Sequence, residues 1–303
     1  MSLLVTGSIG IDTVESPSGK AADVLGGSSV YFSQAASFFS PVRFVGVVGE
    51  DCPAEFLKPL QDNPRIDMSG LEVRRGSKTF RWHGRYHEDV NHRDTVAVAL
   101  NVLGEMGPAI PKAFRDSRYV FLANTHPGLQ LELLSQLESP HLVVADTMDL
   151  WINSERDALV NLLSRIDGVV LNDAEAALLT GQSNMVAAGG EIAQRVRRFV
   201  VIKKGEHGCL LFAQGKVFPM PAFPAVRVVD PTGAGDCFAG AMMGALAAED
   251  SCEIPALRKA MAYGTVTASF VIEDFSLGRL LAIDRERIDA RAREFGEIVR
   301  FPL

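Results

Sequence analysis

The chain has 303 residues, a hydrophobic fraction of 47% and a formal net charge of −7. These values are typical of a globular enzyme that can bury a substantial core. The acidic excess argues against a nucleic-acid-binding protein, which needs a concentrated basic face. No apolar run approaches the ~18 residues of a membrane helix, and the N-terminus does not resemble a signal peptide. We therefore expect a cytoplasmic protein with no membrane or nucleic-acid partner.

Cysteine spacing adds one further exclusion. The chain contains four cysteines, and no two of them have the close spacing of metal ligands. We interpret them as reduced and mostly buried small residues. They are Cys52, Cys209, Cys237 and Cys252.

Short apolar runs alternate with helical patterns along the chain. The strands are predicted at Leu3–Gly7, Val42–Val48, Tyr119–Ala123, Leu142–Ala145, Gly168–Leu171, Val200–Lys203 and Leu210–Ala213. Helices are predicted at Ser28–Phe39, Gln130–Glu138, Glu155–Arg165, Asp173–Thr180, Gly190–Phe199 and Arg285–Ile298. This alternation predicts an α/β fold with a doubly wound, mainly parallel sheet flanked by helices. Ligands of such sheets bind at the carboxyl ends of the strands.

Two polar, β-like segments interrupt this rhythm, at about 12–25 and 70–101. Their alternating residues indicate exposed strands. We expect one domain over 1–303 with these segments forming a small β lid over the site. The alternative is a peripheral hairpin that only shields the sheet. An exposed lid could also pair edge to edge in a homodimer.

The N-terminal part contains two weak motifs. Asp12 follows the first strand and is a candidate acceptor of substrate hydroxyls, although a turn or cap role fits as well. Gly26 and Gly27 precede a helix and would allow a ligand to approach the backbone closely. The serines after them offer a simpler explanation, since they could act only as helix caps.

Two further motifs follow predicted strands in the second half of the chain. Asn172 and Glu175 share a face of a first helical turn and could hold a hydrated Mg²⁺ and phosphate oxygens. Plain helix capping by an acidic first turn explains them equally well. In the next loop, Gly205 and Gly208 permit a tight turn, and Lys203 is expected to reach a nucleotide phosphate.

The most informative segment is Asp230–Asp236, which follows a β-like run at Ala225–Val229 and leads into a helical stretch. Glycines at the start of a helix expose N–H groups that have no intrahelical partner, and these bind anions. A carboxylate beside such a site makes sense if Asp236 takes a proton from a hydroxyl during phosphoryl transfer. The plain alternative is a capped helix with an acidic first turn.

In this order the motifs resemble the ribokinase family, also called the PfkB-type carbohydrate kinases. The match runs from Leu3 to about Ile272. Members of that family transfer the γ-phosphoryl group of ATP to a hydroxymethyl group of a sugar or nucleoside, using Mg²⁺. The resemblance therefore implies a phosphotransferase with an alcohol acceptor, and a doubly wound α/β domain with a β lid.

The resemblance also implies roles for individual residues. Asp236 would be the catalytic base, beside an anion hole at Gly233, Ala234 and Gly235. The substrate site would be lined by Asp12, Gly26, Gly27 and Asp230. The cofactor site would comprise Asn172, Glu175, Lys203, Gly205 and Gly208. Among these, Glu175 and Asn172 would organise Mg²⁺ through water.

Two departures put ribose specificity in doubt. Tyr31 stands where ribokinases commonly have an Asn, and the segment Asp146–Asp149 lacks the Asn found there in that family. The first hypothesis is therefore a kinase of a small sugar or sugar-like acceptor. A nucleoside kinase is the alternative, with aromatic residues such as Trp82 and Tyr86 gripping the base. A non-catalytic sensor and a nicotinamide oxidoreductase are weaker alternatives, because Asp236 is intact and an early G-x-G-x-x-G is absent.

Overall fold

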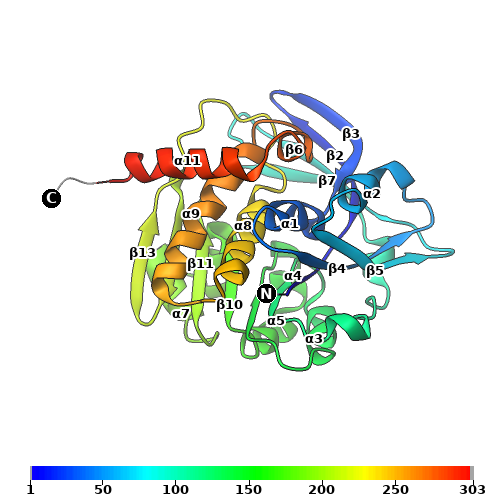
Figure 1. Cartoon of the computed structure of the whole chain (residues 1–303), viewed down its shortest axis with the longest axis horizontal. Coiled ribbons are helices and arrows are strands. Elements are labelled where there is room, and N and C mark those ends of the chain that lie inside the picture. The colour runs from blue at the N-terminus through cyan, green and yellow to red at the C-terminus, as the bar shows by residue number, and fades with distance from the viewer. Residues whose placement is uncertain (1, 301–303) are drawn as a thin grey trace.

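A computed structural model describes residues 2–300 of the chain. Its main feature is a nine-stranded sheet of order β13-β12-β11-β10-β9-β8-β1-β4-β5 (Figure 1). Strands β5 to β11 along this order pair in parallel, and β12 and β13 are added in antiparallel fashion. The strands are β1 (Leu3–Thr6), β4 (Val42–Gly49), β5 (Ile66–Arg74), β8 (Tyr119–Leu122), β9 (Leu142–Ala145), β10 (Gly168–Asn172), β11 (Phe199–Lys203), β12 (Cys209–Ala213) and β13 (Lys216–Met220).

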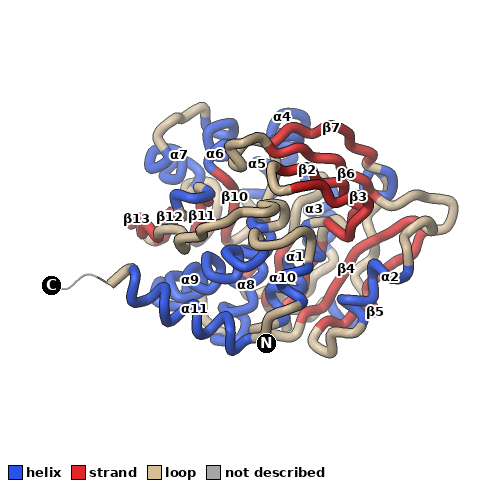
Figure 2. The backbone as a smooth tube through the Cα atoms, turned by 90° about the horizontal axis from the view of Figure 1, so that it is seen from above, coloured by secondary structure: helices blue, strands red, loops and turns tan. Residues whose placement is uncertain are grey.

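Helices cover both faces of this sheet (Figure 2). Alternate side chains of β1 belong to different apolar clusters, with Leu3 and Val5 in one and Leu4 in the other. One face is covered by α1 (Ser28–Ser37), α8 (Ala234–Glu249), α9 (Ile254–Val271) and α11 (Arg285–Ile298). The other is covered by α3 (Pro127–Ser135), α5 (Arg156–Leu163), α6 (Asp173–Thr180) and α7 (Met185–Ile192). The predicted doubly wound α/β fold is confirmed.

A second, four-stranded sheet has the order β3-β2-β6-β7, and we call it the lid. Its strands are β2 (Gly10–Ser16), β3 (Gly19–Gly26), β6 (Phe80–Tyr86) and β7 (Arg93–Ala99). Both segments that the sequence singled out therefore meet in one sheet. The second contributes only from Phe80, because β5 pairs with β4 in the large sheet. The predicted lid boundary at residue 70 lies too early, and the division into one domain stays a prediction.

The predicted strands are observed with their ends shifted by at most one residue, and the helices Asp173–Thr180 and Arg285–Ile298 are observed with the predicted bounds. Some other elements differ. The run Ala225–Val229 is a loop, and its Val226 side chain is fully exposed. Helix α7 spans Met185–Ile192 instead of 190–199, because the Asn184 side chain caps it by accepting from two backbone N–H groups. The remaining helices are α2 (Ala54–Gln61), α4 (Asp149–Ser154) and α10 (Gly278–Leu281). Within residues 2–300 no helix is long and apolar enough to cross a bilayer.

Candidate active site

The glycine-rich segment before α8 is held in place by its own side chains and by Tyr31. Asp230 Oδ1 accepts a 2.8 Å hydrogen bond from the Thr232 N–H. Gly233 has a φ of 78°, and a Cβ on it would lie 2.4 Å from Cδ1 of the Tyr31 ring. Only glycine fits this position. The buried Tyr31 thus supports the turn from beneath, which explains an aromatic residue at that place in the sequence.

The first turn of α8 has no side-chain cap. The Ala234 N–H donates to the Pro231 carbonyl at 3.2 Å, so Gly235 is the freer donor of the predicted anion hole. Lys203, the last residue of β11, brings its ammonium group to the same place. A Cβ on Gly235 would lie only 2.6 Å from Lys203 Nζ. A positive charge therefore adds to the positive end of the helix dipole.

Asp236 lies in this first turn among other charged groups. Burial raises the pKa of its carboxyl to about 6, and the positive charges of Lys203 and Arg93 oppose that rise. The neighbouring Asp146, at the end of β9, is buried, and its Oδ1 has no hydrogen-bond partner within residues 2–300. Burial and the charge of Asp236 raise the pKa of Asp146. A carboxyl with a pKa near neutrality is suited to proton transfer.

Asp12, in lid strand β2, points toward the same region. It is 4% exposed, and its Oδ1 has no partner in the part of the chain that the structure describes. Burial, followed by the charges of Asp230 and Asp236, raises its pKa to about 7. The Gly26 position is needed for this arrangement, because a Cβ there would lie 1.9 Å from Asp12 Oδ2. The buried, unpartnered oxygen leaves an acceptor for a substrate hydroxyl.

Gly27 has a purely structural reason as well. Its φ is 105°, and a Cβ on it would lie 2.4 Å from the Ser8 carbonyl oxygen. The Gly-Gly turn therefore lets the end of β3 pass close to the chain that follows β1. The serine-cap explanation is not realised, since α1 begins after Gly27 with no side-chain cap.

Asn172 and Glu175 form a reciprocal capping box at the start of α6. Asn172 Oδ1 accepts from the Glu175 N–H, and Glu175 Oε2 accepts from the Asn172 N–H, each at 2.8 Å. The capping explanation is therefore realised, and one Glu175 oxygen remains outside the box. Burial raises the pKa of Glu175, and Lys203 and Arg93 oppose that rise.

The loop after β11 is tight for reasons that the structure makes clear. Gly205 and Gly208 have φ values of 52° and 81°. A Cβ on Gly208 would lie 2.0 Å from the Met220 carbonyl oxygen of β13. A Cβ on Gly205 would lie 2.6 Å from Asn91 Oδ1 of the lid. These glycines allow the loop to pack between the edge of the large sheet and the lid.

The lid contacts the segment before α8 directly. The Thr232 hydroxyl donates to the Tyr86 hydroxyl at 3.2 Å. The hairpin of β2 and β3 adds bonds from Ser16 Oγ to the Val229 carbonyl at 2.7 Å and from Ser18 Oγ to the Val228 carbonyl at 3.2 Å. The lid thus lies over the start of α8, where Asp236 is found.

The structure brings most of the predicted residues to one place, and it adds one that the sequence analysis missed. Arg93, in lid strand β7, affects the pKa values of both Asp236 and Glu175. An arginine within a lid segment rich in basic residues gave no distinctive signal.

The residues at this place suit a nucleotide and a hard cation. A lysine ammonium beside a free helix N-terminus is a phosphate site. The oxygens of Asp146 and Glu175 are the ligand type that Mg²⁺ prefers. Among residues 2–300, no three His, Cys, Asp or Glu side chains converge as a complete metal site.

Comparisons with known proteins agree with this chemistry. Residues 25–282 match the family model described as pfkB family carbohydrate kinase. Cytidine kinase of Thermococcus kodakarensis is 31% identical over 249 residues, which cover 80% of this chain and 87% of that protein. Burkholderia thailandensis nucleoside kinase in complex with inosine superposes with a TM-score of 0.78, at 21% identity over 96% of this chain and 98% of that one. Arabidopsis thaliana ribokinase complexed with ribose and ATP superposes with a TM-score of 0.76, at 18% identity over 96% of this chain and 98% of that one.

Proposed function

Because the chain belongs to the pfkB family of carbohydrate kinases, we propose that it phosphorylates the hydroxymethyl group of a nucleoside. The chain is a phosphotransferase that uses ATP and an alcohol acceptor, and the proposal concerns the acceptor and the residues that act on it. The similarity to a cytidine kinase over most of both chains supports a nucleoside. Tyr31, which is buried beneath Gly233, supports a site different from that of ribokinases.

The observation that carries this proposal is the meeting of Asp236, Lys203 and the α8 N-terminus. Asp236 would orient the acceptor hydroxyl and accept its proton, which a carboxylate with a pKa of about 6 can do near neutral pH. The Gly235 amide and Lys203 would stabilise negative charge on the transferring group. When bound, ATP supplies the phosphoryl group and Mg²⁺ neutralises the phosphates. Glu175 and Asn172 would hold the cation through water.

Asp12 gives the acceptor side of the proposal. Its unpartnered Oδ1 could accept from a sugar hydroxyl, which both a nucleoside and a free sugar possess. A free sugar therefore remains the second candidate. Asp230 would act indirectly, because one of its oxygens is bonded to the Thr232 N–H and shapes the turn.

The test is ADP release from Mg-ATP against a panel of nucleosides, free sugars and sugar phosphates, with Asp236→Asn as the blank. We expect a nucleoside, with cytidine as the first compound to try, to give the largest kcat/KM. A free sugar with the largest value would overturn the nucleoside proposal and leave the kinase assignment intact. Wild-type silence across the panel, with ATP bound, would favour a ligand sensor.

We also propose a homodimer that forms through the lid. All seven residues of the edge strand β7 are exposed, and Val96 and Val98 are 46% and 52% exposed. An uncovered edge strand with apolar side chains is a template for pairing with a second copy. The double variant Val96→Lys, Val98→Lys should sediment as a monomer where the wild type sediments as a dimer. A monomeric wild type would contradict the idea. A cytoplasmic location stays a prediction.

A further inference from the structure

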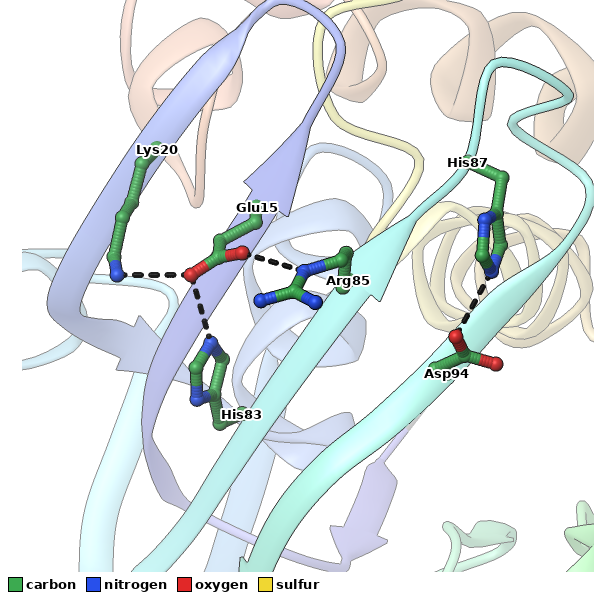
Figure 3. Close-up of polar contacts among 6 residues, drawn as sticks. All are labelled: Glu15, Lys20, His83, Arg85, His87 and Asp94. Atoms are coloured by element: carbon green, nitrogen blue, oxygen red, sulfur yellow. Dashed lines mark hydrogen bonds and ion pairs between the residues drawn. The ribbon is translucent and has the colours of Figure 1, made fainter.

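The arginines of the lid fall into two groups with different partners. On the outer face, Arg81 pairs with Asp23 at 2.9 Å. Arg85 pairs with Glu15 at 2.7 Å, and Lys20 and His83 contact the same carboxylate (Figure 3). Arg81, Arg85 and Lys20 therefore each have a carboxylate partner on the outer face.

Arg93 belongs to the inner face. It stands opposite Tyr86 in the register of β6 and β7, and residues that are directly opposed in a sheet share a face. Tyr86 marks that face as the inner one, because its hydroxyl bonds Thr232 beside the α8 N-terminus. The positive charges of Arg93 and Lys203 oppose the rise in the pKa of Asp236, so Arg93 lies near that carboxyl. Its charge also acts on Glu175, so Arg93 is a lid cation close to the acidic groups of the site.

The guanidinium of Arg93 is charged but not ion-paired. Across residues 2–300 it forms no ion pair within 4.0 Å, and the charges of Glu175 and Asp149 act on it from a longer distance. It rests instead on an aromatic face, with Cζ 5.4 Å from the centre of the Trp82 ring. Trp82 is itself oriented by a 3.3 Å bond from its Nε1 to Thr95 Oγ1. A stacked guanidinium keeps its donors available for a planar, bidentate partner.

We propose that Arg93 is a catalytic arginine that the lid delivers to the transferring phosphoryl group. Its resting contact would be the Trp82 ring, and its working contact would be the phosphoryl oxygens beside Gly235 and Lys203. There it would balance charge while the acceptor oxygen bonds to phosphorus and the bond to the leaving diphosphate breaks. The acceptor proton would pass to Asp236. This proposal rests on the kinase function proposed above.

Kinetics provide the first test. The variants are Arg93→Ala and Arg93→Lys, with Arg81→Ala as the control because Arg81 lies on the same lid but on its outer face. Removing an arginine that stabilises the transferring group should lower kcat by about 100-fold or more, with the acceptor KM changed by only a few-fold. Arg93→Lys should recover part of the loss, because it restores the charge without the planar fork. Arg81→Ala should behave as the wild type.

A binding measurement tests the same contact without turnover. The chain has two tryptophans, Trp82 and Trp151, so Trp151→Phe leaves Trp82 as the only emitter. Mg-ATP should change the Trp82 emission more than Mg-ADP does, because only ATP carries the terminal phosphate that draws the guanidinium off the ring. This difference between ATP and ADP should disappear in Arg93→Ala and persist in Arg81→Ala.

The outcomes separate the two proposals. Equal kcat losses in Arg93→Ala and Arg81→Ala, or a difference between ATP and ADP that survives in Arg93→Ala, would overturn the role of Arg93. A wild type that transfers to no acceptor, but whose Trp82 emission still distinguishes ATP from ADP through Arg93, would overturn only the proposed acceptor. Circular dichroism of each variant checks that the fold is retained.

Discussion

The two sheets of the molecule build opposite walls of the site by different means. Strands β1, β8 and β9 of the large sheet are buried along their whole length, whereas β7 of the lid is exposed along its whole length. The large sheet therefore fixes Lys203 and the start of α8 through close packing on both faces. The lid is held over them by a few hydrogen bonds, such as the one from Thr232 to Tyr86. The catalytic groups therefore lie on the rigid large sheet, and the weakly held lid can open and close over them. This arrangement suits an enzyme that must exclude water during the reaction.

The largest expected effect is on the rigid wall. Asp236→Asn should lower kcat by about 10³-fold or more, because the proton acceptor is lost while shape is retained. The melting temperature should fall little or rise, because a buried charge is removed. A steady-state assay of ADP release measures kcat, and scanning calorimetry of the same sample measures the melting temperature. A folded variant with near-normal kcat would contradict the assignment of Asp236 as the base.

The next effect concerns the contact between β11 and α8. In Gly235→Ala, the new Cβ would meet Lys203 Nζ at 2.6 Å and displace the flexible end of that side chain. We expect kcat to fall by about 10–100-fold, with little change in stability, since one preorganised donor group is moved. Gly190→Ala in α7 is the matched control, because nothing lies within 4 Å of its Cβ. If both variants kept the kcat of the wild type, the position of the Lys203 ammonium group would not matter for catalysis.

Asp12, at the boundary between the lid and the large sheet, should make the free energy of unfolding depend on pH. The pKa of Asp12 is about 7 when folded and 3.8 as a free side chain, so the folded state binds the proton more tightly. Its ionisation therefore costs stability as the pH rises from about 4 to 7. Asp12→Asn should raise the free energy of unfolding by roughly 2–4 kcal/mol at pH 8 and by much less at pH 4. Urea titrations without ligand measure this, and equal shifts at both pH values would contradict it.

The smallest effect is expected on the weak wall. Tyr86→Phe removes the hydrogen bond from the Thr232 hydroxyl without changing the size of the ring. It should cost about 0.5–1.5 kcal/mol of lid closure, seen as a few-fold rise in KM and more hydrolysis of ATP without acceptor. The melting temperature of the whole molecule should hardly move. A large fall in that temperature would mean that the lid is part of the rigid core.

Sequence reasoning worked where one physical cue dominated. Continuous apolar runs identified the buried strands. The glycines around Asp236 identified the turn that leads into α8, because only glycine fits against the Tyr31 ring at position 233. Sequence reasoning failed where a strand-like pattern had no partner strand to pair with. The valines of Ala225–Val229 alternate like a strand, but that segment finds no partner strand and stays a loop.

Long-range placement was the other source of error. Leu71 and its neighbours look like lid residues in sequence, yet β5 completes the edge of the large sheet. Arg93 was missed because its importance comes from standing opposite Tyr86, a register that local pattern does not reveal. For Asn172 and Glu175 the structure shows the helix cap, and their role in holding the cation stays a prediction.

The central pairing of the lid also has a consequence for the order in which the molecule folds. Strands β2 and β6 lie side by side in parallel, with Gly10 opposite Phe80 and Glu15 opposite Arg85. Parallel neighbours cannot be joined by a tight turn, and here the chain between them first builds α1, β4, α2 and β5. Contacts so distant along the chain form slowly, because loop closure must precede them. We therefore expect strands β1, β4 and β5 of the large sheet to form before the β2–β3 hairpin pairs with the β6–β7 hairpin.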